Sequence, residues 1–234
     1  MKVLGISGSP RKSETSGVNT LVKTVLENTG LEYELFSLHG KKLVRGCSAC
    51  LGCVQDNVCK IQDDLTPLWD KMIQADAIVF GAPNYYSGMN VSSRAVMERC
   101  FQFRHQTGDK LWGKLAVAVG VGGTAGQAPA DELEGLFLYN FIETVAKVSG
   151  QGAASCYSCG HGETCQVGIP AMTNEPGFKI TEEMIPSVTK QPEVMEAAAQ
   201  AGKLLGDRLR GGHDRGAVTQ AMQKRLMAQF GEAV

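Results

Sequence analysis

Short apolar runs recur along this chain at intervals long enough for a helix, and this alternation constrains the fold more than any other feature. The runs are bounded by Gly, Pro or Asn and occur at Val3–Ile6, Tyr33–Leu38, Ala77–Gly81 and Leu115–Gly120. Apolar residues at helical spacing fill the intervals, around Leu21–Leu26, Leu68–Ile73 and Val96–Phe103. The alternation predicts an α/β fold with a doubly wound parallel sheet.

A sheet of this kind needs a fifth strand, which the sequence marks only weakly. We expect a fourth helix over Asp131–Val148, which leaves the glycine-rich Gly150–Ser155 as the fifth strand. Beyond it, Gly168–Pro192 contains four prolines and is expected to be a loop. Two amphipathic helices are then expected over Glu193–Arg210 and Ala217–Phe230, and their apolar faces favour packing on the core or contacts between subunits.

The expected organisation is therefore one domain with an extension. The domain covers residues 1–166 and includes two cysteine-rich loops, residues 46–60 and 156–165. The extension, residues 167–234, contains the loop and the two helices and serves packing or oligomer contacts.

Charge and hydropathy restrict the partners of the chain. A formal net charge of −1 provides no basic field that would hold nucleic acid. No run approaches the roughly 20 apolar residues that cross a bilayer, and the first strand follows Met1 directly. We expect a cytoplasmic protein with a small ligand and no nucleic-acid or membrane partner.

The first strand leads into a polar loop, Ser7–Lys12, and a helix that we expect to begin at Asn19 and Thr20. Backbone N–H groups at a helix N-terminus stabilise an anion, and Ser and Thr hydroxyls can add hydrogen bonds. Neither GxxxxGK[ST] nor GxGxxG is present, so a monophosphate is favoured over a nucleoside triphosphate or a dinucleotide. A plain solvated turn is the alternative.

Two further loops should line the same site, because ligands of open α/β sheets lie outside the carboxyl ends of the strands. In Ala82–Met89, Tyr85 or Tyr86 could lie against a planar ring. In Gly120–Gln127, the glycines permit close approach of the backbone to a ligand. Surface aromatics and a flexible loop are the respective alternatives.

Four cysteines crowd into one short segment: Cys47, Cys50, Cys53 and Cys59. In a reducing compartment, such a group indicates metal binding or redox chemistry rather than disulfides. Closely spaced thiolates hold iron–sulfur clusters, so we expect a [4Fe–4S] cluster here. Zinc in a four-cysteine site is the weaker alternative, because such sites usually present two separated CxxC pairs.

A second group, Cys156, Cys159 and Cys165, repeats the intervals of the last three cysteines of the first group. It forms a candidate second metal site without a fourth cysteine. His161 within the segment, a residue from elsewhere or a partner subunit could complete it, and three unligated thiols are the alternative. Cys100 lies in an apolar helical pattern and is expected in the core.

These motifs resemble those of the iron–sulfur flavoproteins of the flavodoxin-like, NADPH-dependent FMN reductase superfamily. The resemblance covers roughly Met1–Ser155 and rests on Gly8–Arg11 with Asn19 and Thr20, the four-cysteine motif and Pro83–Gly88. It implies a flavodoxin-like five-stranded sheet in the order 2-1-3-4-5, with FMN and a [4Fe–4S] cluster on the first cysteine group.

The resemblance also implies which residues bind FMN. At the phosphate they are Ser9, Arg11, Asn19 and Thr20. At the ring they are Pro83, Asn84, Tyr85, Tyr86, Ser87, Gly88, Gly122, Gly123 and Gly126. It further implies a homodimer or homotetramer in which the cluster of one subunit lies near the flavin of another. The insert Lys12–Val18 and the loop Cys156–Cys165 depart from the pattern of the family.

We expect an oxidoreductase in which flavin chemistry with electron pairs is coupled to one-electron transfer with a small-molecule or protein partner. A NAD(P)H-dependent reductase of quinones, oxygen species or another small acceptor is an alternative. A zinc-stabilised scaffold protein is an alternative of another class. No Ser–His–Asp or paired-carboxylate motif is present, so no catalytic acid or base is predicted.

Overall fold

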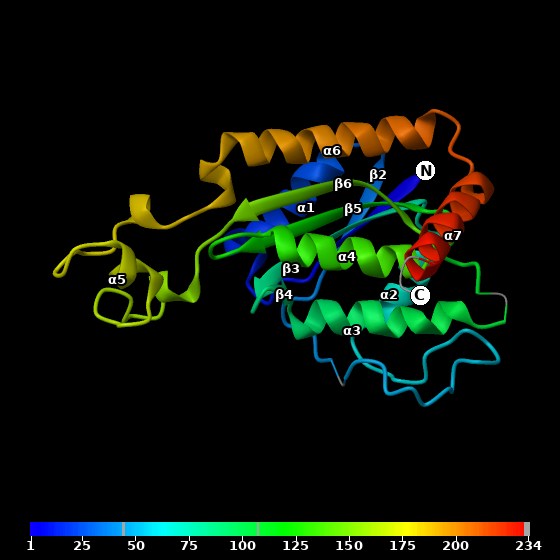
Figure 1. Cartoon of the computed structure of the whole chain (residues 1–234), viewed down its shortest axis with the longest axis horizontal. Helices are drawn as coiled ribbons and strands as arrows, with labels where there is room; N and C mark the ends of the chain where they lie inside the picture. The colour runs from blue at the N-terminus through cyan, green and yellow to red at the C-terminus, as the bar shows by residue number, and fades with distance from the viewer. Residues whose placement is uncertain (44, 107, 232–234) are drawn as a thin grey trace.

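The sheet lies at the centre of the molecule, with helices on both of its faces (Figure 1). This computed structural model describes residues 1–43, 45–106 and 108–231. The five principal strands are β1 Lys2–Ser7, β2 Glu32–Ser37, β3 Ala77–Tyr85, β5 Leu115–Gly122 and β6 Glu143–Gln151. They are parallel and lie in the order β2-β1-β3-β5-β6, which confirms the predicted order. The short β4, Gly88–Met89, pairs antiparallel with the end of β3.

Two hydrophobic layers sandwich the sheet. One face is covered by α1 Gly17–Glu27 and α6 Pro192–Arg210, and the other by α2 Thr66–Gln74, α3 Val91–Arg99 and α4 Gln127–Tyr139. The inner strand β5 is buried along its whole length, as expected for a parallel strand covered on both faces. The two predicted C-terminal helices are confirmed as α6 and α7 Arg215–Gly231.

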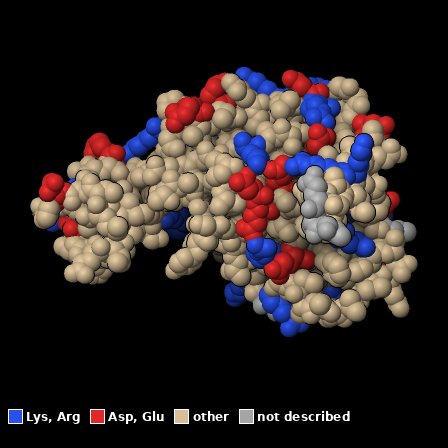
Figure 2. Space-filling view, in the orientation of Figure 1, with Lys and Arg blue, Asp and Glu red and all other residues tan. Residues whose placement is uncertain are grey.

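The last helix packs on α4 through a small apolar cluster of Leu138, Met222 and Leu226. Charged side chains gather beside this contact, whereas the part of the chain that projects to the left is largely uncharged on the face shown in Figure 2. Arg225 on α7 pairs with Glu134 on α4 at 3.0 Å, and Lys147 on β6 reaches the same carboxylate at 2.7 Å. An ion pair therefore ties α7 to the body.

The fourth helix and the last strand differ from the sequence expectation. The helix ends at Tyr139 rather than near residue 148, and the strand occupies residues 143–151 rather than 150–155. Asn140 donates its side-chain amide to the carbonyl of Leu136, and Phe141 adopts a left-handed φ of 51°, which ends the helix. The residues that follow include the β-branched Thr144, Val145 and Val148, which favour a strand.

Two long excursions leave the edge strands of the sheet. After β2, the chain runs below α3 before it enters α2 (Figure 1). After β6, residues 152–187 project away from the body and are called the arm below. The arm includes α5 Ile169–Thr173, and a short 3₁₀ turn, Val188–Lys190, follows it, so the region predicted as a loop contains local helical turns.

The edge strand β2 carries Glu34, which lies between two lysines. Lys2 pairs with it at 3.0 Å, and Lys71 on α2 pairs with its second oxygen. Hydrogen bonds from Lys71 and Lys2 lower the pKa of Glu34. Within the described ranges, no helix has both the length and the apolar character that crossing a membrane requires.

Candidate functional site

The loop after β1 is held between β3 and the start of α3. The Gly8 amide donates to the carbonyl of Gly81 at 2.7 Å, and the Asn90 side-chain amide donates to the carbonyl of Gly8 at 2.9 Å. A β-carbon at Gly8 would lie 1.9 Å from Oγ of Ser93, so only glycine fits here. Ser9 is buried, and its Oγ accepts a hydrogen bond from the amide of Arg11 at 3.1 Å.

The helix after this loop begins earlier than predicted. Ser16 is the N-cap of α1, and its Oγ accepts from the amide of Asn19 at 3.1 Å, so the first helical residue is Gly17 rather than Asn19. The Thr20 hydroxyl donates to the carbonyl of Ser16 at 3.1 Å. Asn19 is 7% exposed, and its buried Oδ1 accepts no hydrogen bond from the described residues. The first turn of α1 therefore presents an unused acceptor beside the loop.

The loops after β3 and β5 are joined to each other. The Asn84 side chain donates to the carbonyl of Ala125 at 2.7 Å. A β-carbon at Gly122 would lie 1.9 Å from that carbonyl oxygen and 2.9 Å from Cβ of Asn84. Pro83 pairs with Val121 in the strand register. The structure thus brings together the two loops that the sequence predicts at a flavin ring.

The segment after β3 is more regular than predicted. Its first residues continue the strand through Tyr85, and a tight hairpin turn then leads into β4. Tyr86 and Ser87 occupy this turn with left-handed φ values of 51° and 62°, which are costly for residues other than glycine. Tyr86 is fully exposed and Tyr85 is half exposed. The hairpin therefore presents aromatic surface at the carboxyl edge of the sheet.

Several residues that the sequence analysis missed support these loops. Glu132 on α4 accepts from the amide of Met89 at 2.5 Å and pairs with Arg94 on α3, which fixes the hairpin. His39, just after β2, contacts the carbonyl of Pro10 through Nδ1 at 2.8 Å. Asn90 has the sequence signal of an N-cap, but its bond to Gly8 depends on the order of the strands.

The four thiols of the first cysteine group line one pocket together with Arg99 and Gln102. The amide of Cys59 donates to Oε1 of Gln102 at 2.9 Å, and the amide of Cys47 donates to Oε2 of Glu98 at 3.3 Å. Left-handed backbone at Ala49, Leu51 and Asn57 curls the loop. The segment is therefore folded against the end of α3.

The cysteines of this pocket do not have the same electrostatic surroundings. A hydrogen bond from the backbone of Gly52 lowers the pKa of Cys50. Partial burial raises the pKa of Cys53, and the neighbouring thiolates of Cys59, Cys47 and Cys50 raise it further. A positive centre bound among the four sulfurs would offset this repulsion.

An ion pair and a hydrogen bond to the backbone hold the end of this loop on α3. Arg99 donates to Oδ2 of Asp63 at 2.6 Å and to the carbonyl of Ile61 at 2.9 Å. Its guanidinium also lies 5.1 Å from the ring centroid of Trp69. Because Arg99 ends α3 whereas Asn90 at its start bonds to Gly8, the cysteine pocket lies about 14 Å along the helix from the phosphate loop.

The second cysteine group lies on the arm. The amide of His161 donates to Sγ of Cys159 at 3.4 Å, and the amide of Cys165 donates to the carbonyl of His161 at 2.9 Å. In neither cysteine group are three His, Cys, Asp or Glu side chains of the described residues positioned to share one metal ion. Cys100 is buried in the core as expected, and burial raises its pKa to about 12.

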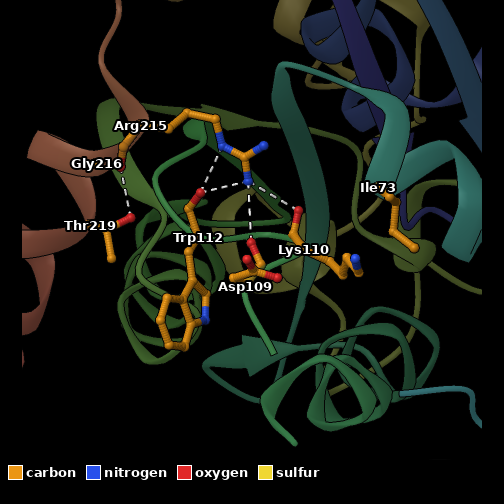
Figure 3. A pocket seen from close by; sticks show the side chains of 7 residues that line it. All are labelled: Ile73, Asp109, Lys110, Trp112, Arg215, Gly216 and Thr219. Carbon is orange, nitrogen blue, oxygen red and sulfur yellow. Dashed lines mark hydrogen bonds between the residues drawn. The ribbon is translucent and has the colours of Figure 1, made fainter. Parts of the chain in front are cut away.

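A larger hollow of about 450 Å³ lies at the amino ends of the strands, between the segment before β5 and the start of α7 (Figure 3). Hydrogen bonds from Arg215 cross its rim. The Arg215 guanidinium donates to the backbone carbonyls of Asp109, Lys110 and Trp112 at 2.7 to 3.4 Å. These bonds dock the start of α7 on the segment before β5. None of the predicted site residues lines this hollow.

Comparison with known proteins places the fold and the motifs in one family. Residues 1–154 match the family model described as NADPH-dependent FMN reductase. An iron-sulfur flavoprotein of Archaeoglobus fulgidus is 32% identical over 148 residues, which are 63% of this chain and 75% of the relative. Iron-sulfur flavoprotein MJ1083 of Methanocaldococcus jannaschii is 36% identical over 135 residues, 54% of this chain and 66% of the relative.

A solved structure supports the fold independently. The flavodoxin WrbA-like protein of Agrobacterium tumefaciens superimposes with a TM-score of 0.51 at 12% identity, over 91% of this chain and 98% of that protein. The flavodoxin-like sheet predicted from the sequence is therefore confirmed. The family model and the relatives show that the chain belongs to the NADPH-dependent FMN reductase family and is one of its oxidoreductases.

Proposed function

We propose that the chain binds FMN at the carboxyl edge of the sheet, carries a [4Fe–4S] cluster on Cys47, Cys50, Cys53 and Cys59, and transfers electrons between partners. The observation that carries this proposal is the joining of three loops into one site. Asn90 ties the loop after β1 to α3, and Asn84 ties the hairpin after β3 to the loop after β5. The family and the names of the relatives agree with this assignment.

The residues of the phosphate loop suit the polar end of FMN. Ser9 and the first turn of α1 offer hydroxyl and amide donors at a helix N-terminus, and Arg11 adds a positive charge. The unused Oδ1 of Asn19 can accept a hydrogen bond from a hydroxyl of the ligand. Thr20 is half buried in the same turn and donates its hydroxyl proton to the carbonyl of Ser16. Its oxygen can accept from a ligand hydroxyl, and rotation of the hydroxyl would free the proton for the phosphate.

The two remaining loops suit a planar ring. The turn of Tyr86 and Ser87 is costly, which is typical of functional sites. Tyr85 and Tyr86 offer exposed aromatic faces, while Pro83, Asn84 and Gly88 place backbone at the edge of the site. Gly122, Gly123 and Gly126 permit close approach. These residues would orient the ring, and no acid or base among them is assigned.

The donor set of the first cysteine group suits an iron–sulfur cluster. Four thiols line one pocket, and a hydrogen bond from the backbone of Gly52 stabilises the Cys50 thiolate as such clusters require. The chemistry that the two cofactors supply when bound is conversion between two-electron and one-electron transfer. Because the pocket lies at the far end of α3, a homodimer or homotetramer that places it near the flavin of another subunit is part of the proposal.

The remaining assignments follow from the same proposal. We assign cofactor binding to residues 1–166 and a supporting role, through packing or oligomer contacts, to residues 167–234. Eight free cysteines favour a reducing compartment, so we propose a cytoplasmic location. The partners would be a small-molecule or protein electron donor and acceptor.

The test is cofactor analysis of protein purified without oxygen, followed by stopped-flow reduction with NADPH and NADH. We expect one FMN per chain and iron with sulfide, and Cys53→Ser should lose about four irons while it retains FMN. Cys100→Ala, which removes a core thiol, should retain both. Zinc in place of iron would contradict the cluster, and loss of FMN binding in all preparations would contradict the flavin site. Undiminished quinone reduction by Cys53→Ser would favour a simple NAD(P)H-dependent reductase instead.

A further inference from the structure

The arm has almost no apolar core. Of residues 152–187, only Gly162, Gly168 and Pro170 are buried, while Val167 and Met172 are 82% and 70% exposed. A metal centre is one of the ways in which a segment that buries so little apolar surface can be ordered.

Polar contacts close the neck of the arm. Gln191 accepts from the amide of Gln151 at 3.0 Å and donates to the carbonyl of Gln151 at 2.6 Å and to that of Ser187 at 2.8 Å. One glutamine therefore joins both ends of the arm. Farther out, Glu163 pairs with Lys179 at 2.7 Å across the arm.

Close packing surrounds the cysteines of the arm. A β-carbon at Gly162 would lie 2.0 Å from the carbonyl oxygen of Cys156, and one at Gly168 would lie 3.1 Å from Cβ of Cys165. The amide of His161 donates to Sγ of Cys159, and the Cys159 thiol donates to the carbonyl of Cys156 at 3.6 Å. Hydrogen bonds to sulfur are one of the features that tune iron–sulfur clusters.

The base of the arm lies against the loop assigned to the flavin ring. The amide of Gly152 donates to the carbonyl of Gly122 at 2.8 Å, and the side chain of Gln151 donates to the carbonyl of Gly123 at 3.0 Å. A β-carbon at Gly123 would lie 2.9 Å from Cβ of Ala154, only two residues before Cys156. The second cysteine group therefore begins only two residues after a contact with the ring loop. The first group instead lies at the far end of α3.

We propose that Cys156, Cys159 and Cys165 hold a second iron–sulfur cluster that orders the arm beside the ring loop. This goes beyond the proposed function, which needs only the first cysteine group. Iron is favoured over zinc because the intervals between the three cysteines equal those of Cys50, Cys53 and Cys59. His161, exposed between Cys159 and Cys165, is the residue of the segment suited to the remaining position.

The experiment measures iron, sulfide, zinc and FMN per chain in four anaerobically purified proteins: wild type, Cys53→Ser, Cys159→Ser and Ser158→Ala. Ser158 is the matched control, because it neighbours Cys159 and its hydroxyl only donates to the carbonyl of Ser155. We expect about eight irons in wild type, a loss of about four in either cysteine variant, and no loss in Ser158→Ala. Electron paramagnetic resonance of reduced Cys53→Ser should still show a cluster.

Other outcomes separate this inference from the proposed function. If the iron content of Cys159→Ser equals that of wild type, the second cluster is overturned. If in addition Cys53→Ser loses all of its iron, the first cluster of the proposed function is still supported. Zinc that disappears in Cys159→Ser also overturns the assignment to iron. Iron that depends on Cys159 but not on Cys53 would support the second cluster and contradict the first. Retained FMN and an unchanged circular dichroism spectrum show that each variant is folded.

Discussion

Arg99 and Asp63 form an ion pair at 2.6 Å whose side chains are 0% and 2% exposed. Replacing Arg99 with methionine keeps most of its volume but leaves the Asp63 carboxylate buried without this partner. We expect Arg99→Met to lower the free energy of unfolding by about 3 to 5 kcal/mol, measured by urea denaturation. The control is Lys23→Met, because Lys23 forms a half-exposed pair with Glu27 at 3.6 Å and should lose at most about 1 kcal/mol. Equal losses in both variants would contradict the importance of burial.

Asn84 offers a direct test of the joined ring loops. Asn84→Ala removes the 2.7 Å hydrogen bond to the carbonyl of Ala125. One such bond is worth about 1 kcal/mol, so we expect the dissociation constant of FMN to rise about fivefold, measured by flavin fluorescence. Asn28→Ala removes a similar bond, to the carbonyl of Thr24 at 2.8 Å near the far end of α1, and should leave the dissociation constant unchanged. Equal effects would show that the loss is not specific to the ring loops.

Lys114 is expected to make the free energy of unfolding change with pH in the alkaline range. Its ammonium group is buried, and donates to the carbonyls of Ile73 and Ala75. Burial and the charge of Arg215 lower its pKa from 10.5 to about 8, against the opposing effect of Asp76.

Between about pH 8 and 10.5, the folded chain therefore binds fewer protons at Lys114 than the unfolded chain does, and the free energy of unfolding rises with pH. The gain is at most about 3 kcal/mol at 1.36 kcal/mol per pKa unit. Lys114→Gln keeps an N–H donor without the charge, so the stability of wild type relative to this variant should increase over this range. A difference that stays constant in urea titrations from pH 7 to 10.5 would contradict the lowered pKa.

Gln191 holds the two ends of the arm together. Gln191→Ala removes its three hydrogen bonds at the neck, and we expect cleavage within residues 152–187 by a protease to accelerate about tenfold, for a loss of about 1.4 kcal/mol. Gln200→Ala, on the exposed side of α6, removes only a bond to Glu196 and should leave the cleavage rate unchanged. Cleavage at the wild-type rate in Gln191→Ala would show that other contacts close the neck.

The sheet was predictable because its inner strands are apolar on both faces, whereas β6 escaped recognition for a physical reason. It is an edge strand, and Glu143 and Lys147 interrupt its apolar residues because one side of the strand remains partly exposed. The start of α1 was misplaced because the N-cap hydroxyl comes from Ser16, inside the insert, rather than from the Asn-Thr pair.

The motifs of the site were predictable from local spacing, but the contacts that support them were not. Glu132 and Met89 are 43 residues apart, and Asn90 and Gly8 are 82 residues apart. Such contacts exist only after the strands have taken their order, and no short pattern announces them. For the same reason, spacing identified the first cysteine group but not its location at the far end of α3.

The charges on the two edge strands also bear on how copies of the chain can associate. An open strand edge is a template on which another chain can extend a sheet, and charged side chains discourage this. On β2, Glu34 is engaged by Lys2 and Lys71, and on β6, Glu143 is engaged by Arg208 at 2.7 Å. A sheet that continued from one copy into the next would have to crowd or break these pairs. The edges therefore disfavour aggregation through strand addition and leave helical faces and loops as the surfaces for ordered assembly.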